Sequence, residues 1–285
     1  PGATADLDPA PGRHPQRVDR VVARSGALEP RHVPGVVDAD VVINLPKAKT
    51  HAQMVITAAV KNSFGVVVGM EKAQWHFRAG RSPEDFARLL LHVHDLVGPR
   101  LSLLDAVVGM EGNGPSGGEP RPLGFLMAST DAHALDAILA RIWGLEPARV
   151  HTLAVAASLG LLPPLDRIEV GGARPDDLRP APAWRLARPA PLRGFGEPAW
   201  LTPLFDRLLS LRPAVDPRRC VACGECVQVC AAGAMALAPD GGPGPRLRID
   251  RDRCIACFCC QEMCPEGAIQ ASAGPLARLL RLGIR

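Results

Sequence analysis

The sequence predicts an α/β domain followed by a small α+β module, and three observations support that division. Short aliphatic runs alternate with amphipathic stretches from residue 38 to about residue 172, a pattern typical of α/β folds. Pro and Arg then dominate, with little periodicity, as in a linker that lies over a surface. All nine cysteines fall between Cys220 and Cys264. We therefore expect an α/β domain at 1–172, a linker at 173–213, a cysteine-rich module at 214–272 and a tail helix at 273–285.

Local patterns predict the elements of the first domain. Aliphatic runs predict strands at residues 40–45, 101–108, 124–128 and 167–170. The clearest helix follows Ser82, whose hydroxyl suits an N-cap, and Gly98 ends it. Two more helices are predicted at 132–143 and 147–159, each followed by a glycine. Asp131, directly before one of them, is expected to be an N-cap rather than a catalyst.

Composition and charge argue against several classes of protein. The formal net charge is only +4, aromatic residues make up 4% and tyrosine is absent, so no nucleic-acid surface is predicted. The longest apolar run, residues 153–165, is interrupted by Gly160 and two prolines and is too short for a membrane span. Cysteines confined to one module indicate a metal site in a reducing compartment, and we expect the cytoplasm.

The cysteines form two copies of one motif. Each copy reads C-x2-C-x2-C-x3-C, and the second follows the first at a constant offset of 34 residues, from 220 to 254. The repeat continues beyond the cysteines, because Gly233-Ala234 is matched by Gly267-Ala268. The motif is the run of bacterial two-cluster ferredoxins, so we expect a ferredoxin-like module that holds two [4Fe-4S] clusters.

In that motif the fourth cysteine of each copy binds the cluster of the other copy. Cys259 corresponds to Glu225 of the first copy, so we expect it to pack near a cluster without binding iron. A pair of zinc sites is the alternative, although zinc ribbons usually pair two separated C-x2-C knuckles. The predicted ligands are Cys220, Cys223, Cys226 and Cys264 for one cluster, and Cys254, Cys257, Cys260 and Cys230 for the other.

Lysine is concentrated in one short part of the chain. The 33 basic residues divide into 29 Arg and 4 Lys, and all four lysines lie between Lys47 and Lys72. We expect Lys47, Lys49, Thr50 and His51 to form a loop after a strand, where α/β proteins bind ligands. Two ammonium groups, a hydroxyl and an imidazole would favour an anionic ligand. His51 is a candidate proton donor because imidazole titrates near neutrality, and Lys47 and Lys49 are further catalytic candidates.

Other residues are candidates for the edge of that site. Lys61 and Asn62 are expected at a helix end, where they either bind a ligand or cap the helix. Residues 112–117 match G-x-G-x-x-G, but prolines follow instead of the helix that a dinucleotide site needs, so nicotinamide binding is not predicted. We expect a loop there, with Glu111 as an acid or cation ligand and Asn113 near the substrate. His76 is a weaker candidate, while His92 and His94 are expected on the solvent face of a helix.

Three stretches carry a resemblance to a known family. They are residues 44–51 (NLPKAKTH), 61–65 (KNSFG) and 110–115 (MEGNGP), and together they resemble the family called domain of unknown function 362. Its iron-sulfur members end in a module of this kind, with a run similar to residues 257–262 (CFCCQE). Members usually carry a further N-terminal α/β portion, so we expect that this chain, which begins at Pro1, is truncated. The resemblance implies no catalytic residue, because the chemistry of the family is not established.

The sequence therefore favours an iron-sulfur oxidoreductase. Electrons from an external low-potential donor would pass through the clusters to a small anionic substrate in the lysine-rich segment, or leave to an external acceptor. Two alternatives remain open: a non-catalytic electron-transfer subunit that docks to a larger redox complex, and a ligand-binding protein whose clusters are structural or sensory.

Overall fold

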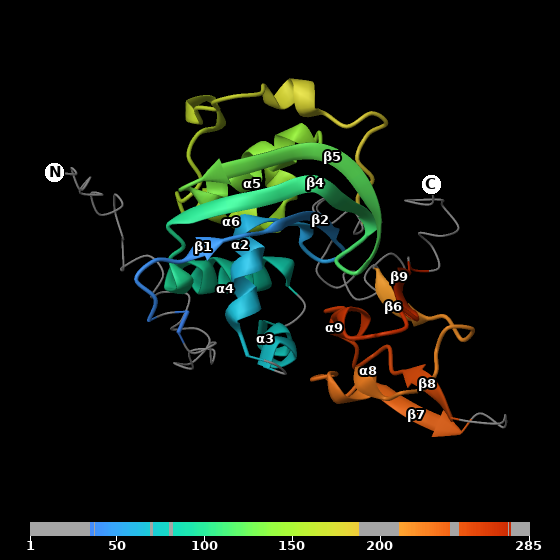
Figure 1. Cartoon of the computed structure of the whole chain (residues 1–285). Coiled ribbons are helices and arrows are strands. Elements are labelled where there is room, and N and C mark those ends of the chain that lie inside the picture. The colour runs from blue at the N-terminus through green and yellow to red at the C-terminus, as the bar shows by residue number, and fades with distance from the viewer. Residues whose placement is uncertain are drawn as a thin grey trace, which may run out of the picture.

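The protein is described by a computed structural model in which an α/β domain lies against a smaller cysteine-rich module (Figure 1). The N-terminal domain contains one sheet in the order β1-β4-β2-β3, with β5 on the other edge of β4. Both β1 and β2 run parallel to β4 and pair with successive stretches of it, while β5 forms a long antiparallel hairpin with β4. The structure describes residues 35–36, 38–68, 71–79, 82–187, 211–239, 245–272 and 274.

The strands of this sheet are β1 (Ile43–Asn44), β2 (Lys47–His51), β3 (Val55–Thr57), β4 (Leu101–Asn113) and β5 (Gly117–Ser129). The helices are α2 (Ala59–Asn62), α3 (Glu71–Ala79), α4 (Pro83–Val97), α5 (Ala132–Ile142) and α6 (His151–Ser158), with short 3-10 turns at Ser63–Val66, Pro147–Arg149, Leu165–Arg167 and Pro175–Leu178. Helix α5 contacts β4 and β5, and α4 packs against both α2 and α6. Their apolar faces enclose one core, whose fully buried members include Phe86, Leu104, Leu139 and Leu153.

The helix ends agree with the sequence analysis because local side chains determine them. Ser82 Oγ accepts a hydrogen bond of 3.2 Å from the Asp85 backbone N–H, and Gly98 ends α4 in the left-handed conformation. Asp131 caps α5 by accepting bonds from the His133 and Ala134 backbone N–H groups. The predicted helix at 147–159 is divided into a 3-10 turn and α6.

Several strand predictions were wrong or too short. Residues 167–170 form no strand: the chain makes a 3-10 turn at Leu165–Arg167 and continues without regular structure. Within 40–45 only Ile43–Asn44 pair with β4. The two predicted strands at 101–108 and 124–128 are present, but both extend into a longer hairpin. The glycine-rich stretch 112–117 is the turn of that hairpin, and a Cβ on Gly114 would collide with the Thr50 carbonyl.

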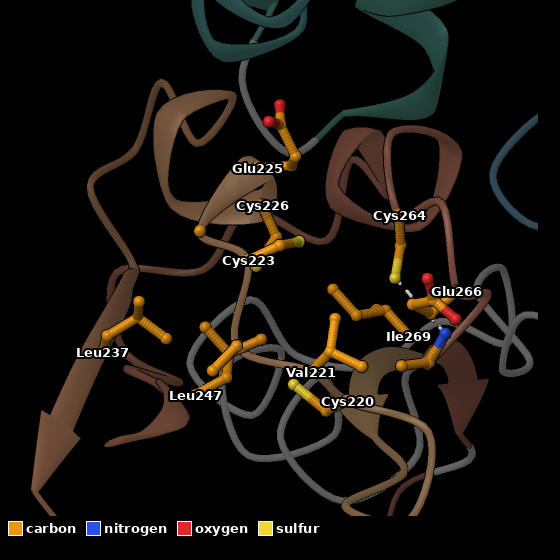
Figure 2. Close-up of a pocket in the computed structure, with 13 residues that line it drawn as sticks. Cys220, Val221, Cys223, Glu225, Cys226, Leu237, Leu247, Cys264, Glu266 and Ile269 are labelled. Carbon is orange, nitrogen blue, oxygen red and sulfur yellow. Dashed lines mark hydrogen bonds between the residues drawn. The ribbon is translucent and has the colours of Figure 1, made fainter. Parts of the chain in front are cut away.

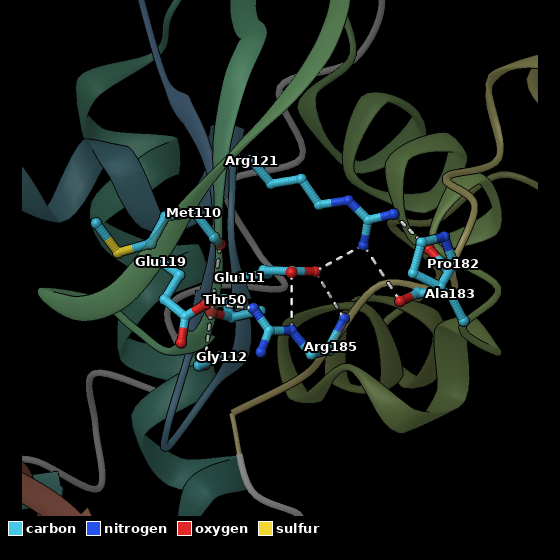
Figure 3. Close-up of polar contacts among 9 residues, drawn as sticks. All are labelled: Thr50, Met110, Glu111, Gly112, Glu119, Arg121, Pro182, Ala183 and Arg185. Carbon is cyan, nitrogen blue, oxygen red and sulfur yellow. Dashed lines mark hydrogen bonds and ion pairs between the residues drawn. The ribbon is translucent and has the colours of Figure 1, made fainter. Parts of the chain in front are cut away.

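The first part of the predicted linker packs against the α/β domain. Trp184 stacks on Trp143 with ring centroids 4.3 Å apart. Beside it, Arg121 and Arg185 each place a guanidinium nitrogen 2.8 Å from the buried Glu111 carboxylate, as Figure 3 shows. Arg121 also donates hydrogen bonds to the Pro182 and Ala183 carbonyls, so residues 182–185 are held against the β4–β5 hairpin. We call this segment the strap. Glu111 therefore has a structural role rather than that of the predicted acid or cation ligand.

Replacing Glu111 with alanine is expected to release this strap. The change leaves two guanidinium groups without their shared carboxylate, and charged hydrogen bonds of this kind are worth about 1.5–3 kcal/mol each before rearrangement. The structure predicts faster proteolytic cleavage near residues 182–187, which limited trypsin digestion would measure. Glu119→Ala is the matched control, because Glu119 also pairs with Arg185 but its side chain is largely exposed, at 71%. Equal cleavage rates in both variants would show that Glu111 does not hold the strap.

The cysteine-rich module repeats one backbone pattern. It contains two strand pairs, β6 (Arg212–Val215) with β9 (Ile269–Ser272) and β7 (Met235–Pro239) with β8 (Pro245–Ile249), and two short helices, α8 (Glu225–Gln228) and α9 (Cys259–Glu262). Equivalent residues share left-handed conformations, with φ of 56° at both Ala222 and Ala256, and of 86° at Gly224 and 63° at Phe258. The internal repeat seen in the sequence is therefore also a repeat of backbone geometry.

Two expectations lie outside the described residues. These are the tail helix, apart from residue 274, and the linker between residues 188 and 210. Among the residues that the structure describes, no helix has the length and apolar character needed to cross a membrane.

Candidate metal centre

Four cysteines from both copies of the motif surround one pocket of the small module (Figure 2). Its empty volume is about 350 Å³, part of it open to solvent. Most of the remaining wall is apolar, with Val221, Leu237 and Ile269 among its residues, and Glu225 and Glu266 also line it. The four thiols around the pocket are those of Cys220, Cys223, Cys226 and Cys264.

The remaining motif cysteines gather in the same crossed manner. Burial raises the pKa of Cys260, and the neighbouring thiols of Cys257, Cys254, Cys230 and Cys226 raise it further. Cys230 is thus a neighbour of the second copy although it belongs to the first. The thiol of Cys226, which belongs to the group around the pocket, also raises the pKa of Cys260. The two groups of thiols are therefore neighbours.

The residues fit an iron-sulfur group. Burial and then the neighbouring thiols of Cys220 and Cys223 raise the pKa of Cys226 to about 11, so a bound metal would be needed to hold these thiolates together at neutral pH. Backbone N–H groups of Ala234 and Ala268 lie 3.2 and 3.3 Å from the sulfurs of Cys230 and Cys264. Hydrogen bonds of this type to thiolate sulfur tune iron-sulfur centres.

The two groups of thiols differ in exposure. Cys223 is exposed, and Val221 beside it is 64% exposed. Cys226 of the same group is buried, at 7%. In the other group Cys254 and Cys260 are buried, at 8% and 6%, and none of the four cysteines is exposed. We call the group with Cys223 the outer set and the group with Cys254 the inner set.

Helix α9 of the inner set faces the α/β domain (Figure 1). Phe258, at its start, lies in an apolar cluster with Ala52, the residue after β2, and with Leu211 and Ala271. Gln261 Nε2 donates a hydrogen bond of 3.2 Å to the backbone carbonyl of Asn113. Glu262 Oε1 lies 3.6 Å from His51 Nε2. The α/β domain therefore contacts the helix that contains Cys260.

His51 is held in one neutral tautomer. Its Nδ1 accepts bonds of 3.0 and 3.2 Å from the Gln53 and Met54 backbone N–H groups, so its proton lies on Nε2 and points toward Glu262. Complete burial, followed by the positive charge of Lys61, lowers the pKa of His51 to about 4. Titration of His51 near neutrality was the expectation from the sequence, but in the fold its imidazole is neutral at pH 7.

Lys61 lies beside His51. It occupies the last turn of α2, and its ammonium lies 5.9 Å from the ring centroids of both Phe64 and Phe86. Burial of the ammonium lowers the pKa of Lys61, although the Glu262 carboxylate opposes that change. Partial removal of the Glu262 carboxylate from water raises its pKa, but the neighbouring His51 and Lys61 lower it more, to about 2, so Glu262 is ionised at neutral pH.

The other residues predicted for the substrate site do not lie together in one loop. The predicted loop at Lys47–His51 is strand β2 itself, because Lys47 and Lys49 alternate with the buried Ala48 and Thr50. Lys47 forms an exposed ion pair of 2.7 Å with Asp105. Thr50 points to the opposite side and donates to the Gly112 carbonyl. Lys49 lies within electrostatic range of His51.

Two further candidates make structural contacts. Asn62, at the end of α2, donates to the Asn44 side chain over 2.8 Å, which joins α2 to the sheet. Asn113 contributes its backbone carbonyl to Gln261. His92 and His94 are half-buried, and His94 Nδ1 lies 2.7 Å from Ser63 Oγ, so their predicted solvent face was wrong.

Sequence reasoning ranked His76 as a weaker candidate and missed Gln261 and Glu262, and these three residues complete the domain contact. His76 of α3 is buried and stacks on Phe86 with ring centroids 3.8 Å apart, and the charges of Lys61 and Glu262 both affect its pKa. Glu262 and Gln261 were overlooked because they follow the cysteines of the other domain. One signal was visible: Phe258 stands where the first copy has Gly224, and a bulky residue in a left-handed turn requires packing to hold it.

Comparisons with known proteins found matches to both the α/β domain and the cysteine-rich module. A thylakoid-associated protein of Synechocystis sp. is 41% identical over 169 residues, which cover 59% of this chain. The chain spans about half the length of that relative, since the matched region covers 52% of it. No solved structure matches the chain. Residues 17–141 match the family described as domain of unknown function (DUF362), and residues 213–268 match the 4Fe-4S dicluster domain. The chain thus combines a DUF362 domain with a 4Fe-4S dicluster domain, as the sequence motifs predicted.

Proposed function

We propose that this chain is an iron-sulfur oxidoreductase that binds two [4Fe-4S] clusters and passes electrons to an anionic substrate at the α/β domain. The observation that carries the proposal is the position of α9, which contains Cys260 of the inner set and contacts His51 of the sheet. Bound clusters supply one-electron transfer. The cytoplasm is the proposed location, because free thiols need a reducing compartment.

The two sets of cysteines support a direction for the electrons. The outer set opens to solvent at Cys223, which makes it accessible to an external low-potential donor. The inner set is covered by the α/β domain through Phe258 and Gln261. Electron tunnelling falls steeply with distance, so a partner protein would exchange electrons at the outer set and a substrate at the inner one.

The relative in Synechocystis sp. favours a second candidate. Its name records association with thylakoids, which favours an electron-transfer subunit that docks to a larger redox assembly. In that case the α/β domain would bind a partner protein in place of a small substrate.

Reoxidation experiments would test the first candidate. Anaerobically purified protein would be reduced, mixed with small unsaturated carboxylic acids, and followed by its visible absorbance. We expect at least one acid to reoxidise the protein, and Lys61→Gln to slow that reaction about tenfold or more through loss of a charged contact. Lys47→Gln, which changes an exposed ion pair, is the control. If no acid reoxidises the protein but a one-electron carrier protein does, the second candidate is correct.

A further inference from the structure

One face of the sheet packs against helices, and the opposite face is largely exposed. Successive residues of a strand point to opposite faces. Leu104 and Ala106 of β4 are fully buried in the core that also contains residues of α2 and α5. Their neighbours Leu103, Asp105 and Val107 point the other way, and each is partly or largely exposed. We call the face that they share the open face.

Large apolar side chains gather on the open face. Ile43 of β1 pairs with Leu101 of β4. Lys47 of β2 pairs with Asp105, so the odd-numbered residues from 43 to 47 lie on the face of Asp105. Leu126 of β5 pairs with Asp105 from the other side. The exposed fractions of the large apolar residues are 56% for Ile43, 66% for Leu45, 49% for Val107 and 59% for Leu126.

An apolar surface of this kind marks an interaction site. Contiguous exposed apolar patches are uncommon on monomers and usually belong to an interface. Parallel strands, such as β1 and β2 beside β4, normally have both faces of their sheet covered. The open face is therefore a surface that another polypeptide would cover.

The charges of the open face indicate what covers it. Lys47 Nζ and Asp105 Oδ2 lie 2.7 Å apart on adjacent strands, and each side chain is about half exposed, at 46% and 48%. In a twofold dimer the same patch of both copies meets itself. A twofold axis between β2 and β4, parallel to them, brings each Lys47 opposite the partner's Asp105. The face thus complements itself, whereas its balanced charges offer little attraction to a strongly acidic or strongly basic protein.

The backbone favours contact through the face and not through the edge of the sheet. Among the described strands, β5 pairs with β4 alone, so it forms an edge. Pro120 and Pro122 of β5 have no backbone N–H to offer to a further strand, which blocks pairing along that part of the edge. Aliphatic side chains of two sheet faces interdigitate well when the sheets pack about 10 Å apart.

We propose that two copies of this chain form a twofold dimer through their open faces. Ile43, Leu45 and Leu126 of both copies form its apolar centre, and each Lys47 pairs with the partner's Asp105. The inference goes beyond the proposed function, because it concerns assembly and depends on neither a substrate nor the path of the electrons.

The mass of the anaerobically purified holo-protein tests the proposal. Sedimentation velocity over a range of concentrations should give twice the 30.2 kDa of one chain, with a dissociation constant of about 1 μM or lower. Leu45→Glu and Leu126→Glu, on different strands, each place a carboxylate in the apolar centre and should weaken the dimer about a hundredfold or more. Leu165→Glu is the matched control, because this leucine is 42% exposed in a 3-10 turn outside the sheet, and its dimer should be unchanged.

Exchange of the two charges tests the twofold arrangement. Lys47→Glu brings carboxylates together at both contacts, and Asp105→Lys brings ammonium groups together, so each variant alone should dimerise about tenfold more weakly or worse. A mixture of the two variants restores opposite charges at both contacts. The mixed dimer should therefore form with nearly the affinity of the unmodified protein. Because only folded chains can be rescued in this way, the mixture separates pairing from misfolding.

The other results would overturn the proposal. A mass of one chain at every concentration refutes the dimer. A dimer that survives both Leu45→Glu and Leu126→Glu uses another surface, and a mixture without rescue contradicts the pairing of Lys47 with Asp105. If the protein stays single but binds vesicles of phosphatidylcholine and phosphatidylglycerol, and Leu126→Glu abolishes that binding, the open face serves a membrane and not a second copy.

Discussion

Replacing Cys230 with serine is expected to remove the iron of the inner set, although Cys230 belongs to the first copy of the motif. The Cys230 thiol lies beside Cys254 and Cys260 and contributes to the rise in the pKa of both. A cluster that loses one of four thiolates is held poorly, because metal binding and local folding are coupled. Anaerobic iron and sulfide analysis should fall from about eight to about four of each per chain.

Cys264→Ser provides the reciprocal test. Cys264 lines the pocket of the outer set, so its loss should remove the other cluster and leave the inner one. Cys259→Ser is the matched control, since it removes a cysteine of α9 outside both predicted ligand sets. If Cys259→Ser also halves the iron content, the ligand assignment within residues 257–260 is wrong. If Cys230→Ser removes the outer cluster, ligation is not crossed.

Replacing Asp136 with alanine is expected to destabilise the α/β domain by about 2–4 kcal/mol. The buried Asp136 carboxyl accepts bonds of 2.7 and 3.2 Å from the Ala59 and Val60 backbone N–H groups at the start of α2. Alanine leaves both donors buried without a partner. Anaerobic urea unfolding followed by tryptophan fluorescence would measure the loss, because Trp143 and Trp184 both lie in this core.

The same carboxyl makes stability depend on pH. Burial raises the pKa of Asp136 from 3.8 to about 7, although its two backbone bonds oppose the change. The folded state therefore holds a proton that the unfolded chain has lost, so this contribution is complete below about pH 4 and is lost as pH rises through about 7. Asp136→Asn keeps an acceptor and should show a smaller loss than alanine, without this pH dependence. An unchanged pH profile in Asp136→Asn would exclude Asp136 as its origin.

The sequence predicted correctly those structural features that depend on residues close together in the chain. The caps of α4 and α5 depend on Ser82, Gly98 and Asp131, which act within one turn of their helices. The cysteine ligand sets remain a prediction that rests on spacing, and the repeated backbone geometry of the module accords with it.

Contacts between distant residues explain what the sequence did not reveal. Strand β2 was mistaken for a loop because its polar residues conceal the alternation that places Ala48 and Thr50 in the core. The meeting of His51 with Glu262 depends on how two domains dock, and no local pattern encodes that. The lysine cluster was a useful signal for Lys61, yet Lys47 belongs to the surface.

The position of Phe258 links maturation of the protein to its tertiary assembly. Phe258 follows Cys257 directly and packs against Ala52. The loop whose cysteines would bind iron therefore also supplies the aromatic side chain that joins the two domains. Binding of the inner cluster and docking of the two domains must then favour one another by thermodynamic linkage. A newly synthesised chain without iron would expose the Phe258 side chain and the apolar surface around Ala52. Such a protein would be a substrate for chaperones and proteases.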